Sequence, residues 1–152
     1  MKLLEHIQPA LNAGDLQEVL HLTMEHFRAD TGTIHLLESD GILHLKAASA
    51  GIASPVLEAV RLVPIGKGMA GLAVQRKEPV SVCNLQTDAS GAARPGAKAT
   101  GMEGALVVPL FIGREAVGAL GIANRAPRAF TADETALLTD VGRAIAALAP
   151  VK

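Results

Sequence analysis

Several residue types are scarce in this chain of 152 residues, and each scarcity excludes a class of protein. Trp and Tyr are absent and Phe occurs three times, so the sequence offers no aromatic platform for stacking bases. Lys and Arg number 14 against 15 Asp and Glu, which gives no broad positive field for nucleic acid or anionic lipid. The only cysteine, Cys83, allows neither an internal disulfide nor a cysteine-rich zinc site.

Long hydrophobic runs are also missing. No apolar run reaches the roughly 18 residues that span a bilayer, and the first residues lack the hydrophobic region of a signal peptide. With the single cysteine, this predicts a cytoplasmic protein that binds neither a membrane nor nucleic acid. Core material is abundant, since 49% of the residues are hydrophobic, and the length suits one domain.

Helical periodicity is clearest near the two ends of the chain. The first amphipathic helix is predicted to begin at Asp15, and its apolar stripe comprises Leu16, Val19, Leu20, Thr23 and Phe27. The last helix is predicted to begin with a capping box of Thr131 and Glu134. Its stripe comprises Leu137, Leu138, Val141, Ile145 and Leu148. These two helices are expected to bracket a sheet.

Between the helices the pattern is that of strands joined in hairpins. Residues 33–38 and 42–47 flank Asp40-Gly41, which is a strong hairpin signal. Residues 105–112 and 116–124 form a second predicted hairpin whose continuous apolar character indicates burial on both faces. Shorter segments predict helices at 55–60 and 69–77 and strands at 61–64 and 79–83. Antiparallel hairpins favour an α+β fold over a doubly wound parallel sheet.

A glycine pattern, G-x-G-x-x-G, occurs at Gly66, Gly68 and Gly71, with Asp88 downstream. In a dinucleotide fold this pattern would need a firm strand before it and a full crossover helix after it. Pro64 interrupts the approach, and the following helix is short. A tight structural turn is therefore the favoured interpretation.

The histidines and the cysteine are weighed as candidates for chemistry. If Asp40-Gly41 sets the register of its hairpin, His35 and His44 point to the same face of the sheet. No third ligand is nearby in sequence, so hydrogen-bonding or solvent-facing histidines are favoured over a metal site. Cys83 is expected at the end of a buried strand, where a thiol is inert.

The long stretch of residues 84–103 has no period and is the first place to look for a binding site. Its polar side chains are those that a lid over a ligand would supply. They are Asn84, Thr87, Asp88, Arg94, Lys98 and Thr100. Below them, Leu106 and Val108 are expected to form an apolar floor. The alternative is a solvated loop that binds nothing.

The order of these elements resembles the GAF domain family. The resemblance covers residues 14–148, with an N-terminal segment at 1–13 and a tail at 149–152, and is most specific at 65–71, 107–113 and 130–138. It implies a central antiparallel sheet of five or six strands, terminal helices on one face, and a small-molecule pocket under a loop on the other. GAF domains sense cyclic nucleotides, tetrapyrroles and other metabolites.

Departures from known branches of the family narrow the choice of ligand. Bilin-binding members carry a cysteine beside a histidine, whereas Asn84 follows Cys83, so a bilin is not expected. Free methionine sulfoxide reductases resemble this chain but place cysteines where Ala70 stands and near Lys98. Cyclic-nucleotide members share a motif whose basic and acidic residues are expected to pair. Its partial matches here are Asn124, Arg125, Phe130, Asp133 and Glu134.

The resulting prediction is a non-catalytic, small-molecule-binding GAF domain with a role in signal transduction. Its ligand is unknown, and a small metabolite or a cyclic nucleotide is considered. Arg94 is the expected anion contact, because guanidinium can donate two hydrogen bonds to one carboxylate or phosphate. The alternatives are a divergent reductase or other thiol enzyme that uses Cys83, and a ligand-free interaction scaffold.

Assembly as a homodimer through the terminal helices is also predicted, with a signalling protein as a further possible partner. Small residues on the last helix would let a second helix approach closely. They are Ala136, Gly142, Ala144 and Ala147. Leu22 and Met24 on the first helix fall outside its main stripe and would add apolar surface.

Overall fold

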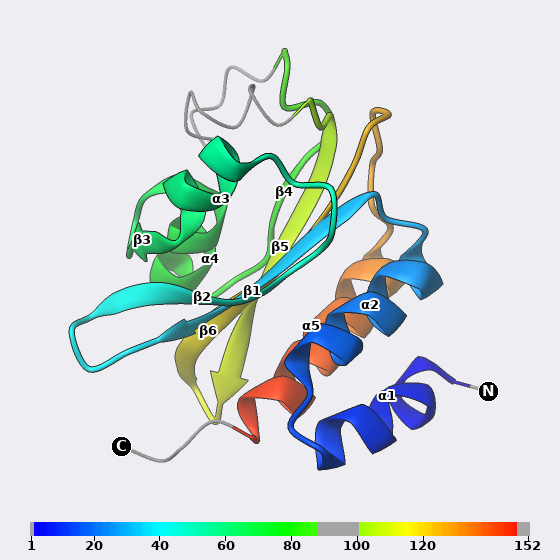
Figure 1. Cartoon of the computed structure of the whole chain (residues 1–152), viewed down its shortest axis with the longest axis vertical. Coiled ribbons are helices and arrows are strands. Elements are labelled where there is room, and N and C mark those ends of the chain that lie inside the picture. Colours follow the sequence, from blue (N-terminus) through cyan, green and yellow to red (C-terminus); the bar gives the residue numbers. More distant parts are fainter. Residues whose placement is uncertain (1, 88–100, 149–152) are drawn as a thin grey trace.

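A computed structural model describes residues 2–87 and 101–148 as one antiparallel sheet with helices on both faces (Figure 1). The helices are α1 (Leu3–Asn12), α2 (Leu16–Phe27), α3 (Ser54–Val60), α4 (Gly68–Arg76) and α5 (Ala132–Ala146). The strands are β1 (Thr31–Leu37), β2 (Ile42–Ala48), β3 (Leu62–Pro64), β4 (Val80–Val82), β5 (Gly104–Ile112) and β6 (Glu115–Asn124). The predicted α+β class and the predicted antiparallel sheet of five or six strands are confirmed, and the sheet has six strands.

The strand order is β3-β2-β1-β6-β5-β4. Both predicted hairpins are present, β1 with β2 and β5 with β6. Pairing of β1 with β6 joins them in the centre of the sheet. Because β5 and β6 lie inside the sheet and are covered on both faces, their sequences read as continuous apolar runs.

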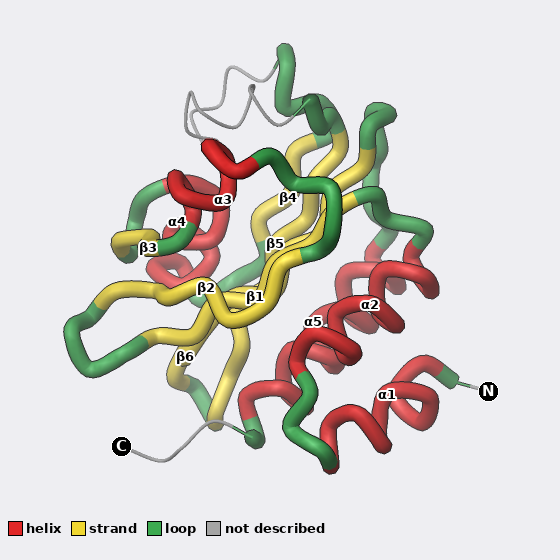
Figure 2. Tube along the Cα trace, in the orientation of Figure 1, coloured by secondary structure: helices red, strands yellow, loops and turns green. Residues whose placement is uncertain are grey.

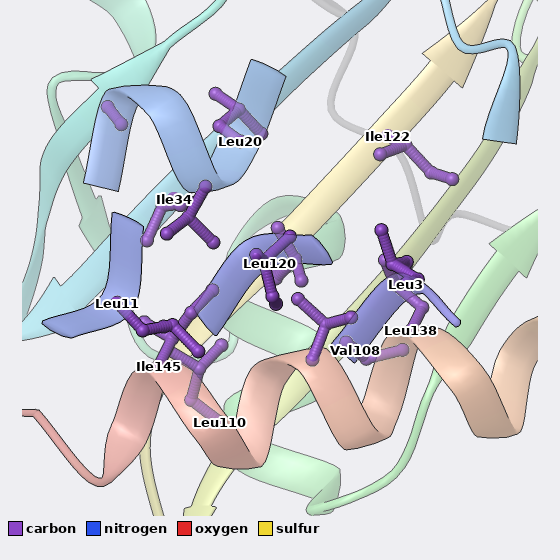
Figure 3. Close-up of a cluster of buried hydrophobic side chains, with 14 of the residues drawn as sticks. Leu3, Leu11, Leu20, Ile34, Val108, Leu110, Leu120, Ile122, Leu138 and Ile145 are labelled. Carbon is purple, nitrogen blue, oxygen red and sulfur yellow. The ribbon is translucent and has the colours of Figure 1, made fainter. Parts of the chain in front are cut away.

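The terminal helices α1, α2 and α5 cover one face of the sheet (Figure 2), which we call the helix face. Large aliphatic side chains from the helices and from β1, β5 and β6 fill the space between the layers (Figure 3). Those exposed by less than 2% include Ile7, Leu20, Ile34, Leu106, Leu110, Leu120, Leu138 and Ile145. The helix face is therefore a close-packed hydrophobic core.

Helix α1 was not predicted from the sequence. It contains Pro9, and Leu3, Ile7 and Leu11 are buried in the core of the helix face. Helix α1 is thus packed into the same core as α2 and α5. A short helix of this kind is stabilised by tertiary packing more than by its own propensity.

The opposite face carries α3 and α4, and we call it the α3–α4 face. Its buried cluster combines residues of α4 with residues of β2 to β6, among them Leu43, Val63, Ala73, Val74 and Val107. Helix α4 is anchored by buried positions, whereas no residue of α3 is buried. Among the described residues, no helix is long and apolar enough to cross a bilayer.

Helix α5 is fixed at its N-terminus as the sequence predicts. The Thr131 side chain accepts from the Glu134 backbone amide at 3.1 Å, and the Glu134 carboxylate accepts from the Thr131 amide at 2.9 Å. The hydrogen bond from the Thr131 amide lowers the pKa of the Glu134 carboxyl, with a further lowering by the Arg128 guanidinium. Of the predicted apolar stripe, Leu138, Val141 and Ile145 are buried, whereas Leu148 is exposed.

Candidate functional site

The predicted lid residues fall into two groups. Asn84 and Thr87 lie directly after β4, where the Asn84 side-chain oxygen accepts from the Gln86 amide at 2.9 Å. Asn84 is half-buried and Thr87 is exposed. Asp88, Arg94, Lys98 and Thr100 lie outside the described residues. A ligand-binding role for this segment stays a prediction.

The predicted floor lies on the wrong face of the sheet. Leu106 and Val108 are fully buried in the core of the helix face, so they cannot line a site on the α3–α4 face. Strand alternation points Ala105 and Val107 to the α3–α4 face instead. The sequence does not reveal which residues of β5 point to which face, because β5 is apolar at nearly every position.

Small residues line the central strands on the α3–α4 face. On β6 they are Ala119, Gly121 and Ala123, and Ala105 lies on the neighbouring β5. A Cβ atom placed on Gly121 would lie 3.2 Å from Val107 Cγ2 and 3.5 Å from Thr33 Oγ1. This strip of small side chains contrasts with Leu120 and Ile122, the alternating β6 residues that face the helices.

His35 is the buried histidine on the α3–α4 face, at the register position opposite Ala119 of β6 and Leu45 of β2. Its side chain is 3% exposed. The ring Nε2 lies 2.7 Å from the carbonyl oxygen of Val60, the last residue of α3. Burial lowers the pKa of His35 from its ordinary value of 6.5, and the bond to Val60 opposes that shift. The ring is therefore neutral near pH 7.

The prediction that His35 and His44 share a face is wrong. The hairpin loop has three residues, with Gly41 at a φ of 77°, so His44 pairs with Leu36 and His35 with Leu45. A three-residue loop that ends in a left-handed residue shifts the register by one and reverses the faces. His44 instead hydrogen-bonds the Asp40 carboxylate at 2.8 Å, which lowers the pKa of Asp40.

The glycine-rich segment is a structural turn. Gly66 and Gly68 have φ values of 88° and 63°, which favour glycine. A Cβ atom on Gly71 would lie 2.4 Å from the Pro64 carbonyl oxygen, so the chain passes too closely for a side chain. The backbone thus accounts for all three glycines without a bound nucleotide.

Cys83 is exposed rather than buried, because it follows the last residue of the short strand β4. Its backbone carbonyl accepts a hydrogen bond from the Arg128 amide. Within the described residues, no group of three or more His, Cys, Asp or Glu side chains is arranged to hold a metal ion.

The partial cyclic-nucleotide motif is a structural network, and its basic member is Arg128 instead of Arg125. The Arg128 guanidinium donates to Glu134 at 2.5 Å, to the Phe27 carbonyl at 2.7 Å and to Asn124 at 2.9 Å. It also lies 4.4 Å from the centroid of the Phe130 ring. These contacts join the end of β6 to the end of α2 and to the start of α5.

Surface hollows border the sheet at two places in the described part of the chain. One, of about 290 Å³, lies between α2 and residues Ser49 and Ala50. The other, of about 460 Å³, lies between β2 and α3 and includes Leu45 and Leu57. The second hollow adjoins the helix whose last carbonyl binds His35.

Comparison with known protein families gives one match that covers most of the chain. The profile described as the GAF domain matches residues 14–148. The chain belongs to the GAF domain family. No curated protein matches it.

Solved GAF structures share the fold at low sequence identity. The GAF domain of an Acinetobacter phosphoenolpyruvate-protein phosphotransferase is 22% identical with a TM-score of 0.79, covering 96% of this chain and 89% of that one. The free methionine-R-sulfoxide reductase of Neisseria meningitidis, solved with its substrate, is 17% identical with a TM-score of 0.78, covering 96% and 85%. The nlh2 GAF domain of A. aeolicus in an inactive state is 17% identical with a TM-score of 0.72, covering 96% and 92%. A free methionine-R-sulfoxide reductase and the GAF domains of other proteins thus share the fold of this chain.

Proposed function

We propose that this GAF domain is a non-catalytic sensor that binds a small molecule on its α3–α4 face. The observation that carries the proposal is the strip of Ala119, Gly121 and Ala123 on the central strand β6. Large aliphatic side chains occupy the same strand on its other face, whereas the small residues here let other groups approach the strand backbone closely. The neighbouring His35 supplies a polar group, as binding sites with few polar groups require.

The chain has too few cysteines for the redox chemistry of the reductases that it resembles. Structures similar to this chain include free methionine-R-sulfoxide reductases. The resemblance places their cysteines where this chain has Ala70, in α4, and near Lys98. Cys83 is the only thiol of the chain, so a cycle that needs two cysteines of one chain cannot run. A Cys83→Ser variant that abolishes a measured reductase turnover would contradict this part of the proposal.

The loop after β4 is proposed to close the site. Asn84 and Thr87 start this segment beside the α3–α4 cluster, to which Leu85 belongs. Asp88, Arg94 and Thr100 would continue the lining, with Arg94 as the contact for an anionic group. An Arg94→Met variant should weaken an anionic ligand and leave an uncharged one unaffected, as measured by calorimetry.

Native mass spectrometry of protein purified from its own host is the experiment that tests the function. We expect a retained small molecule of defined mass. Added back at 100 times its dissociation constant, it should raise the free energy of unfolding by about 2.7 kcal/mol. Protein without a retained molecule, and without a change in melting temperature in host metabolite extract, would favour the scaffold alternative.

Homodimerisation through the helix layer is also proposed, with one change to the expected interface. Gly142 is buried against Val108 and Leu110 of the sheet, so it does not face a partner. Helix α1 packs on α2 and reaches α5, whereas Ala136 and Ala147 of α5 are exposed. Sedimentation equilibrium should show a dimer that Ala147→Glu splits. A monomer at tens of micromolar would reject this assembly.

A further inference from the structure

His35 has one satisfied ring nitrogen and one that is not. Across residues 2–87 and 101–148, its Nδ1 is the buried side-chain nitrogen or oxygen that has no hydrogen-bond partner. Buried polar atoms in native proteins nearly always have partners, because leaving one unpaired destabilises the folded state. An orphaned atom on the α3–α4 face therefore needs an explanation.

The contact at Nε2 determines what Nδ1 can bind. The Val60 carbonyl only accepts hydrogen bonds, so Nε2, 2.7 Å away, carries the ring proton. The neutral ring then has a lone pair at Nδ1 and accepts there. In this tautomer, Nδ1 can accept a hydrogen bond from an N–H or O–H donor.

The surroundings of His35 are apolar, and helix α3, which covers it, makes few buried contacts. Its register partners are Ala119 and Leu45, and no residue of α3 is buried. Besides the bond from His35, the end of α3 is tied to the sheet by the Leu45 amide, which donates to the Arg61 carbonyl at 3.0 Å. Segments with few buried contacts open at low free energy, so α3 can admit a ligand to His35.

We propose that His35 is the recognition residue of the small-molecule site and that it selects a ligand with an amide-type N–H, such as a cyclic amide. The N–H of the ligand donates a hydrogen bond to Nδ1, while Nε2 continues to donate to the Val60 carbonyl. A carboxylate or phosphate group presents only acceptors, so an anionic group of the ligand cannot bind at Nδ1 and would lie elsewhere in the site. This inference rests on the proposed function, because it assigns the ligand chemistry of the same face.

The test uses the wild-type protein with ¹⁵N-labelled histidine and a matched pair of probes. The probes are 2-piperidone, which has an N–H, and N-methyl-2-piperidone, which has none. We expect the free protein to show the proton on Nε2 of His35. We expect 2-piperidone to move the Nδ1 resonance upfield, as hydrogen bonding to that lone pair does, and the N-methyl probe to leave it in place.

Three variants sharpen the result. His35→Gln retains an amide donor near the Nε2 position but loses the acceptor, and it should weaken 2-piperidone binding about tenfold, the effect of one hydrogen bond to a buried acceptor. His35→Asn places an amide oxygen near Nδ1 and should retain part of the preference for the N–H probe. His44→Gln, on the opposite face of β2, should bind as wild type does.

Each outcome separates this inference from the proposed function. An Nδ1 resonance that neither probe moves, or that both move equally, overturns the role of His35. If backbone signals of Ala119 and Gly121 still shift with either probe, the ligand site on the α3–α4 face stands. An Nδ1 resonance already hydrogen-bonded in the free protein and insensitive to both probes would assign the acceptor to a buried water and overturn the inference.

Discussion

The two faces of the sheet are formed by the same strands, yet the side chains that these strands present to the two faces differ in size. On β6, Leu120 and Ile122 point to the helix face and are buried among large aliphatic side chains, whereas Ala119 and Gly121 point to the α3–α4 face. The helix face has the hydrogen-bonded Arg128 network at its margin and a buried Thr23 whose hydroxyl donates to the Val19 carbonyl at 2.7 Å. The α3–α4 face contains a buried histidine with an unpaired nitrogen. The helix face thus contains the larger aliphatic core, and the α3–α4 face, with its small residues and its unpaired nitrogen, is the one on which we propose ligand binding.

The largest expected effect comes from a cavity on the helix face. Leu106→Ala should lower the free energy of unfolding by about 2–5 kcal/mol, because the side chain is fully buried in a close-packed core. Urea denaturation measures this loss. Ligand affinity of the folded variant should stay that of the wild type, since Leu106 faces away from the proposed site. A variant of nearly wild-type stability with lost affinity would reverse the assignment of the faces.

The Arg128 network should be the next most sensitive feature. Arg128→Lys should lower the free energy of unfolding by about 2 kcal/mol, because a lysine cannot reproduce the fork that joins Glu134, Asn124 and the Phe27 carbonyl. Arg125→Lys is the matched control and should change stability by less than about 0.5 kcal/mol. Equal losses in the two variants would show that the network has no special role.

A smaller effect is expected at the capping box of α5. Thr131→Ala removes the side-chain oxygen that accepts from the Glu134 amide and should cost about 1 kcal/mol. Thermal unfolding measures the change. An unchanged melting temperature would mean that the capping bond contributes nothing to the anchoring of the helix.

The α3–α4 face should respond to pH where the helix face does not. Because the folded-state pKa of His35 lies below its ordinary 6.5, the unfolded chain binds more protons in the interval between the two values. Stability should therefore fall as pH drops below about 6.5, until the folded pKa is reached. His35→Gln should flatten this part of the profile, as measured by urea denaturation at a series of pH values. The lowered pKa of Asp40 affects a separate, more acidic range below 3.8.

Local signals in the sequence predicted the elements with strong local chemistry. The hairpins, the Asp15 and Thr131 caps and the turn at Gly66 and Gly68 follow from residue types that permit few other conformations. Helix α1 was missed, since it contains Pro9 and depends on burial of Leu3, Ile7 and Leu11.

The site was harder to predict than the fold, for two physical reasons. Strand β5 is buried on both faces, so its apolar run carries no alternation, and Leu106 was placed on the wrong side. The face of His35 depends on whether the loop at Asp40 and Gly41 has two or three residues, which the Asp-Gly pair does not decide. A buried histidine opposite Ala119 is visible only once β1 and β6 are paired.

The division between the faces is tested most directly by alanine methyl resonances, because alanines lie on both sides of the sheet. Ala105, Ala119 and Ala123 report on the α3–α4 face, and Ala10, Ala47 and Ala146 report on the helix face. In spectra of alanine-methyl-labelled protein titrated with the molecule retained from its host, the first three signals should shift and the last three should stay. Shifts confined to Ala10, Ala47 and Ala146 would contradict the central claim.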